Sequence, residues 1–129
     1  MATLTVNQIT RTGLVLGIAL ASTLSVESAA ASDQFPNDGK TFVMVANDDT
    51  DPHSVVFTSQ KSVLGLNLAE LIVAVVANMV DGEDYKIIGP FPKNIFNDAN
   101  GRVQVTYKEA ADGSGIDASA DFSIIVFSL

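Results

Sequence analysis

The chain contains no cysteine, which excludes disulfides, cysteine-ligated zinc and thiol chemistry. Basic residues are also scarce: 7 Lys and Arg stand against 15 Asp and Glu, and the net charge is -8. No basic cluster occurs anywhere in the sequence, whereas proteins hold a phosphate backbone mainly through Lys and Arg. We therefore expect no direct contact with nucleic acid.

The residue patterns of known catalytic sites are absent as well. His53 is the only histidine, and it stands in Asp51-Pro52-His53, a predicted surface turn, so a metal cluster or a histidine-based triad would lack partners. No glycine-rich phosphate loop, G-x-S-x-G elbow or H-E-x-x-H motif occurs. We therefore expect a protein that is not an enzyme and that carries no cofactor.

The densest acidic group consists of Asp48, Asp49 and Asp51. Carboxylates at this spacing could bind Ca²⁺, but neither a following glycine nor a downstream glutamate completes an EF-hand loop. We expect a solvated acidic turn rather than a metal site, although cation binding here stays open. A second acidic turn at 81–84 is expected to be charged because it is exposed.

Turn signals divide the chain into short apolar runs. Asx-Gly pairs, which favour turns with positive φ, occur at 38–39, 81–82, 100–101 and 112–113. The apolar runs between them are expected to be strands, at 41–46, 55–58, 71–76, 85–88, 102–107 and 122–127. The two prolines in Gly89-Pro90-Phe91-Pro92 cannot donate to a strand ladder, so the strand before them should end at Ile88 or Gly89. Such spacing predicts an all-β fold, a small antiparallel β-sandwich.

Within the predicted strands, the residue pattern indicates which faces are buried. Residues 102–107 (RVQVTY) alternate as a half-buried strand does, and 122–127 (FSIIVF) is apolar on both faces, as in a central strand. Residues 68–79 could form a helix, but their β-branched residues favour a strand. The predicted core residues are Phe42, Val43, Val45, Val56, Ile72, Val73, Val75, Ile88, Val103, Val105, Ile124 and Val126.

The first 32 residues have the three-part pattern of a secretory signal peptide. Arg11 precedes an apolar stretch at 13–21, and a small-residue run at 28–32 offers an A-x-A cleavage site. The chain nevertheless carries this segment from Met1 onward, and we expect it to be retained. An apolar, nearly uncharged segment becomes ordered when another surface covers it, so the sequence predicts a docking arm.

We accordingly divide the 129 residues into an N-terminal arm and linker, 1–38, and a β-sandwich body, 39–129. Threonines and glycines interrupt any helix pattern in the arm, so we expect an extended segment that pairs with another sheet. The arm residues expected to bind a partner are Leu4, Val6, Ile9, Leu14, Leu16, Ile18 and Leu20. Phe91 is expected either to anchor a partner contact or to plug the end of its own sandwich.

A second stretch, Val63 to Val80, is long enough to span a bilayer in principle. Asn67, Glu70 and Asn78 interrupt it, and a glutamate in mid-bilayer is expensive. We therefore interpret this stretch as buried strands of a soluble core and expect no membrane partner.

Several segments occur in a characteristic order. A TRTG stretch at 10–13 is followed by Phe35–Val45 (FPNDGKTFVMV), Ile88–Pro92 (IGPFP), Ile95–Asp98 (IFND), Gly101–Tyr107 (GRVQVTY) and an apolar C-terminal strand. This order resembles small virion proteins of tailed bacteriophages, some of which are capsid decoration or cement proteins. The family's usual Pro-Ala-Gly turn after the middle strand is replaced here by residues 80–83.

The resemblance implies a non-enzymatic structural protein that binds the major capsid protein, stabilises the shell and forms a homo-oligomer. It also implies a location in the virion, after assembly in the host cytoplasm. Two alternatives remain. One is another virion component, in the tail or at the head-tail junction. The other is a secreted or periplasmic β-sandwich that binds sugars or surfaces.

Overall fold

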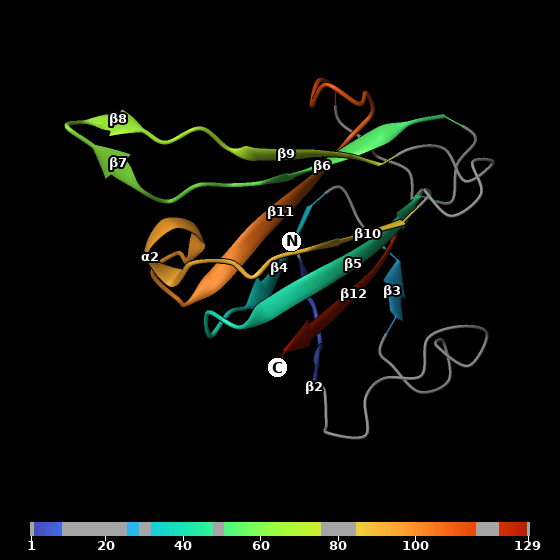
Figure 1. Cartoon of the computed structure of the whole chain (residues 1–129), viewed down its shortest axis with the longest axis horizontal. Coiled ribbons are helices and arrows are strands. Elements are labelled where there is room, and N and C mark those ends of the chain that lie inside the picture. The colour runs from blue at the N-terminus through green and yellow to red at the C-terminus, as the bar shows by residue number, and fades with distance from the viewer. Residues whose placement is uncertain are drawn as a thin grey trace.

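Strands with alternating or continuous apolar residues build two β-sheets, which pack against each other as the predicted all-β sandwich (Figure 1). The computed structural model describes residues 2–8, 26–28, 32–47, 51–75, 85–115 and 122–128. Most neighbouring strands run antiparallel, as predicted, and the two exceptions both involve the N-terminal strands.

The first sheet is centred on the alternating strand that the sequence predicts at 102–107. In spatial order its strands are β1 (Ala2–Thr3), β4 (Ser32–Pro36), β11 (Arg102–Lys108), β6 (His53–Phe57) and β9 (Leu71–Val75). The pairing places Val103 opposite Phe35 of β4 and Val105 opposite Phe57 of β6. β9 pairs antiparallel with β6 and forms the outer edge of this sheet. For residues 68–79 the sequence allowed a helix or a strand and favoured the strand. That prediction of a strand is confirmed over 71–75.

The second sheet is centred on the strand that is apolar on both faces. Its strands are β10 (Tyr85–Ile88), β5 (Thr41–Asn47), β12 (Phe122–Ser128) and β2 (Val6–Gln8), with β3 (Val26–Ser28) also beside β12. β12 pairs with β5 along its whole length. On its other side it meets β3 at 123–125 and β2 at 126–128. The prediction of a central C-terminal strand is confirmed.

The remaining elements lie beside the two sheets. β7 (Ser62–Val63) and β8 (Leu66–Asn67) form a small hairpin of their own. The helical turn α2 (Lys93–Phe96) precedes β11. In the part of the chain that the structure describes, no helix combines the length and apolar character needed to cross a membrane.

The core lies between the sheets and follows the predicted alternation. In β11 the side chains of Val103, Val105 and Tyr107 are buried, while those between them are half-buried. The predicted core residues that are fully buried are Val43, Val45, Val56, Val75, Val103, Val105, Ile124 and Val126. Val73 and Ile88 are partly buried and pack against this core.

Two predicted core residues lie elsewhere, and the period of two along a strand explains both. Phe42 points away from the face that carries Val43 and Val45, is half-buried, and stacks on Phe127 with 5.7 Å between ring centroids. The Ile72 side chain points to the opposite face of β9 from that of its neighbour Val73 and is 49% exposed. Both residues were expected in the core because their runs are apolar on both faces.

The N-terminal strands belong to the sandwich itself. β1 pairs parallel with β4 in the first sheet, and β2 pairs parallel with β12 in the second, so the chain crosses between sheets at 4–5. At the crossing the Leu4 amide donates to the Gln34 carbonyl at 2.7 Å, and the Leu4 side chain is part of the core. β4 lies within the predicted linker. The division into an arm at 1–38 and a separate body therefore fails for residues 2–8 and 32–36.

An aromatic cluster closes one end of the core. The ring of Phe91 is 4.8 Å from Phe57, 5.5 Å from Phe35 and 5.6 Å from Phe96, measured between centroids. Asn37 holds this segment in place, because its Nδ2 donates to the Phe91 carbonyl at 2.9 Å. Phe91 is 1% exposed, as expected of a plug of its own sandwich, and its contact with a partner stays a prediction.

The turn at Asp38-Gly39 forms as predicted but does not close a hairpin. Gly39 adopts a φ of +90°, a region that glycine enters without steric cost. The strands that it joins, β4 and β5, belong to different sheets, so this turn carries the chain across the end of the sandwich. The Asx-Gly pair at 81–82 lies outside the described residues.

Candidate interaction surfaces

The hairpin of β7 and β8 projects beyond the two sheets and away from β5 and β12 (Figure 1). It is the continuation of the β6–β9 pair, and its two sides meet again where the Leu68 amide donates to the Lys61 carbonyl at 2.9 Å. Its base is tied to α2, because the Gln60 amide donates to the Ile95 carbonyl at 2.8 Å. Residues 58–72, which we call the hairpin arm, are therefore held at the base and exposed at the tip.

The turn at the tip contains an unusual residue. Leu64 and Gly65 both have positive φ, of 53° and 80°, as the two central residues of a type I′ turn do. Asn, Asp and Gly are the residues that such turns favour, whereas a bulky leucine in the left-handed region is strained by about 1–2 kcal/mol. The sequence of this turn is therefore not explained by the needs of the hairpin.

The large apolar side chains of the hairpin arm are exposed. Leu64 is 98% exposed and Leu66 75%, and these values decide that neither contributes to the core of its own chain. The other large apolar residues exposed on the hairpin arm are Val63, Leu68, Leu71 and Ile72. Residues 62–69 contain no charged residue, although the chain carries a net charge of -8. The expectation that 63–80 forms buried strands is thus wrong for this part, whose strands are exposed.

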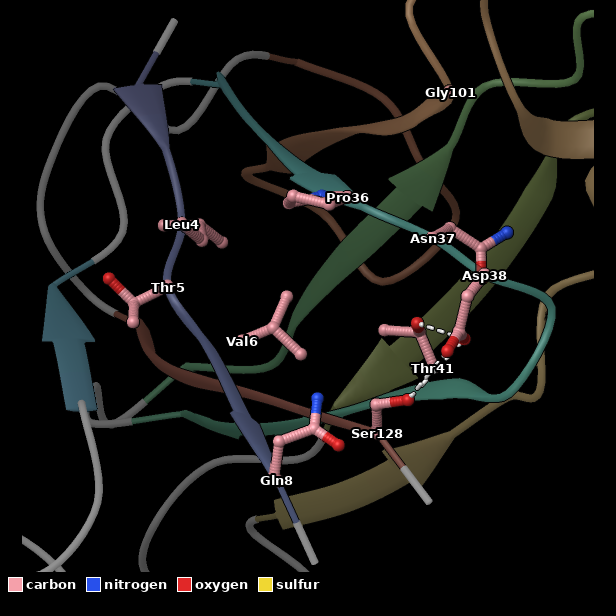
Figure 2. Close-up of a pocket in the computed structure, with 10 residues that line it drawn as sticks. All are labelled: Leu4, Thr5, Val6, Gln8, Pro36, Asn37, Asp38, Thr41, Gly101 and Ser128. Carbon is pink, nitrogen blue, oxygen red and sulfur yellow. Dashed lines mark hydrogen bonds between the residues drawn. The ribbon is translucent and has the colours of Figure 1, made fainter.

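A second feature is a pocket of about 500 Å³ at the end of the sandwich where β1 leads into β2 (Figure 2). Leu4, Thr5, Val6 and Gln8 follow one another along one side of it, and the Asp38 turn and Ser128 lie on the other (Figure 2). Its lining residues are Leu4, Thr5, Val6, Gln8, Pro36, Asn37, Asp38, Thr41, Gly101 and Ser128. The side from Leu4 to Gln8 thus mixes apolar and polar side chains, and the opposite side presents the Asp38 carboxylate and the Ser128 hydroxyl.

Asp38 supplies the formal charge of this pocket. Its Oδ1 accepts the Lys40 amide at 2.8 Å and the Thr41 hydroxyl at 3.2 Å, and its Oδ2 accepts the Ser128 hydroxyl at 3.2 Å. These hydrogen bonds, the one from the Lys40 amide foremost, lower the pKa of Asp38 below its usual value of 3.8. The carboxylate therefore stays ionised near neutral pH and could accept a cationic or hydrogen-bonding group.

A pH dependence follows from three aspartates that accept turn amides. The Ser114 side chain and amide lower the pKa of Asp112. For Asp98 burial alone would raise the pKa, but the hydrogen bonds from the Arg102 and Asn100 amides and the Gln104 side chain, together with the Arg102 charge, lower it. With Asp38, all three have a folded pKa below the unfolded value of 3.8, so the unfolded chain binds more protons between these values. Their stabilisation is complete above pH 3.8 and is lost as pH falls through the lowered values.

We therefore expect the urea midpoint to decrease below pH 3.8 and to decrease less steeply in Asp112→Asn, which cannot titrate at that position. The measurement is urea unfolding followed by circular dichroism at constant ionic strength over a series of pH values. A midpoint that already falls near neutral pH, or an unchanged slope in Asp112→Asn, would contradict this expectation.

Of the residues predicted to bind a partner, the structure describes Leu4, Val6 and Phe91. Leu4 is buried in the core of its own chain, and Val6 is half-buried against the same core, so partner binding by these two residues stays a prediction. Their places are fixed by strand pairing inside the chain rather than by an external surface. The other predicted arm residues, Ile9, Leu14, Leu16, Ile18 and Leu20, lie outside the described residues.

His53 is also placed differently from its prediction. It belongs to β6 rather than to a surface turn, and it is buried. Its Nδ1 lies 2.7 Å from the Glu109 carbonyl oxygen, which can only accept, so Nδ1 carries the proton. The sequence predicts a turn for His53 because Pro52 precedes it, whereas in the structure β6 begins directly after this proline.

Within the described residues, no group of three or more His, Asp or Glu side chains could hold a metal ion. Asp51 is exposed, as a solvated turn would be, while Asp48, Asp49 and the acidic turn at 81–84 lie outside those residues.

The hairpin arm was missed at the sequence level, although its residue pattern contained a signal. Leucines on both sides of a glycine, at 64 and 66, stand where a turn normally has polar residues. The chain significantly matches no protein-family model, no curated protein and no solved structure, so its surfaces have to be interpreted from their own chemistry.

Proposed function

We propose that the protein is a non-enzymatic virion component, a capsid cement or decoration protein that binds the major capsid protein and stabilises the shell. In this role it acts in the virion after assembly in the host cytoplasm. The support for a virion setting is the ordered set of segments that resembles small virion proteins of tailed phages. The support for a binding role is the hairpin arm.

The observation that carries the binding role is Leu64. Its side chain is 98% exposed, and its backbone has a φ of 53° that leucine rarely adopts. The residue therefore costs conformational energy without adding to the core, and such costs persist where a residue serves function. A leucine at the tip of an uncharged hairpin can enter an apolar depression of a capsid subunit and lose water there. Apolar burial of a leucine contributes about 1.5–3 kcal/mol.

The hairpin arm is also suited to its position. Its base is tied to the body by the Gln60–Ile95 hydrogen bond, so the tip is presented at a defined place and loses little freedom on binding. The acidic body (net charge -8 for the chain) would keep decorated particles from adhering to one another. The partner contact is thus assigned to the tip, and the acidic surface is left to solvent.

The variant Leu64→Asn tests this function. Asparagine adopts positive φ more readily than leucine, so the melting temperature of the isolated protein should stay unchanged or rise slightly. Binding to capsids stripped of the protein should fall by roughly tenfold or more, the equivalent of about 1.4 kcal/mol. Co-sedimentation of purified protein with stripped capsids measures the binding.

The matched control is Ile87→Asn on β10, which replaces another exposed apolar residue (56% exposed) on the other sheet. This variant should bind capsids as the original chain does. Capsid binding that is unchanged in Leu64→Asn, or lost equally in both variants, would overturn the assignment of the hairpin arm.

A further inference from the structure

The pocket at the end of the sandwich has the size of a site for a small molecule. Its volume of about 500 Å³ lies within the range of about 300–1,000 Å³ that such sites enclose. Two of its polar side chains, Thr41 and Ser128, stand opposite each other where β5 pairs with β12, and they are 1% and 2% exposed. Strand pairing therefore fixes this wall before any ligand enters.

The Asp38 carboxylate in this pocket has hydrogen bonds but no charged partner. Among the described residues, Lys40 and Thr41 donate to Oδ1, and the Ser128 hydroxyl, which lies between the two oxygens, is the only group of another residue that donates to Oδ2. A carboxylate oxygen can accept two donors, so Oδ2 can accept one more. No Lys or Arg side chain in the described part of the chain forms an ion pair with Asp38.

Apolar side chains lie near this charge. Leu4 and Val6 line the side of the pocket across from Asp38, and Pro36 lies above them (Figure 2). Val6 is half-buried and Pro36 is exposed, so both have surface that a ligand could cover. The pocket therefore suits a molecule that combines a positive charge with an apolar stem.

We propose that this pocket binds a primary ammonium group on an apolar stem, with the ammonium on Asp38 Oδ2 and the stem against Val6 and Pro36. A calcium ion fits less well, because it takes six to eight oxygen ligands and the pocket offers a single carboxylate. A guanidinium also fits less well. Its bidentate contact needs both carboxylate oxygens, and Oδ1 already holds two donors, whereas an ammonium acts as a point charge.

The test is a titration of the isotope-labelled full chain with butylammonium near neutral pH, followed by amide chemical shifts. We expect saturable shifts centred on Val6, Thr41 and Ser128. In Asp38→Asn the affinity should fall by roughly tenfold or more, because asparagine can still accept the turn amide but carries no charge. The matched control is Asp112→Asn, which removes the charge of another turn aspartate that accepts a serine amide but lies outside the pocket. It should bind as the original chain does.

A second comparison keeps the proposal testable if Asp38→Asn does not fold. Butanol has the same stem without the charge, and it should bind the original chain at least about tenfold more weakly than butylammonium. Equal binding of the two compounds would overturn the proposal. An equal loss in both variants, or shifts that spread over the acidic residues without saturating, would also overturn it, because these results indicate only general attraction to an acidic chain.

An ammonium on an apolar stem occurs both in free amines and in the lysine side chain, and a parallel titration separates these sources. It uses lysine with both backbone ends capped. Tighter binding of butylammonium would support a site for free amines, and tighter binding of capped lysine would support a site for a lysine of a partner protein. The pocket contains no residue of the hairpin arm, so Leu64→Asn should bind both compounds as the original chain does, whatever its effect on capsid binding.

Discussion

Replacing Phe91 with alanine should lower the free energy of unfolding by about 3–5 kcal/mol, the range for a buried phenylalanine. The side chain is fully buried and its ring contacts those of Phe35, Phe57 and Phe96. Removing it opens a cavity at the end of the core and also removes aromatic pairs, each worth about 0.5–1.5 kcal/mol beyond burial. Urea unfolding measures the loss.

The control for this variant is Phe42→Ala, which removes an aromatic side chain from the outer face of the second sheet. Phe42 is half-buried and has one stacked partner, Phe127, so its loss should be clearly smaller. If Phe91→Ala cost less than about 1 kcal/mol, within the range of ordinary single substitutions, the aromatic cluster would not support the core. A selective loss of capsid binding with full stability would support the partner-contact prediction.

The strands of the body could be predicted because their signals are local. Alternation in RVQVTY and the apolar run FSIIVF are properties of neighbouring residues, and the structure places β11 and β12 there with the expected orientation and central position. Prolines end a strand for reasons that also act within a few residues, and β10 ends at Ile88 as predicted.

What could not be predicted depends on partners distant in the sequence. The Leu4 side chain is buried in the core, and its amide pairs with the Gln34 carbonyl; nothing in the N-terminal residues indicates that pairing. The sequence left Phe91 with two explanations because both a plug and an anchor require an aromatic residue between prolines. In the structure its ring packs against aromatic rings from other segments, and Asn37 binds the Phe91 carbonyl and the Asn97 side chain.

The hairpin arm is a second part of the structure that the sequence did not predict, because its apolar residues are exposed rather than buried. The apolar residues of 63–72 were assigned to the core because apolar residues are usually buried. Residues 53–57 and 71–75 do pair within the sheet, but the chain between them runs beyond the body, where no second layer covers it. The type of a residue indicates whether it prefers to be buried. Whether it is buried depends on whether the fold places another layer against it.

Removing residues 1–8 should destabilise the whole sandwich, and this is the sharpest test of where the N-terminal residues belong. The deletion takes away β1 and β2, the bond from the Leu4 amide to Gln34, and the Leu4 side chain from the core. Loss of a buried leucine side chain alone costs about 2–5 kcal/mol. Domains are stable by only about 5–15 kcal/mol, so the truncated chain should be partly or wholly unfolded at room temperature.

Single substitutions separate core packing from the effect of truncation. Leu4→Ala should cost about 2–5 kcal/mol, whereas Gln8→Ala, at an exposed position of the same N-terminal segment, should change stability by less than about 0.5 kcal/mol. The measurements are urea midpoints of the two variants and the circular dichroism spectrum of the truncated chain. A truncated chain with native stability and no capsid binding would show that residues 1–8 form a docking arm after all, and that their pairing with β4 and β12 contributes nothing to the fold.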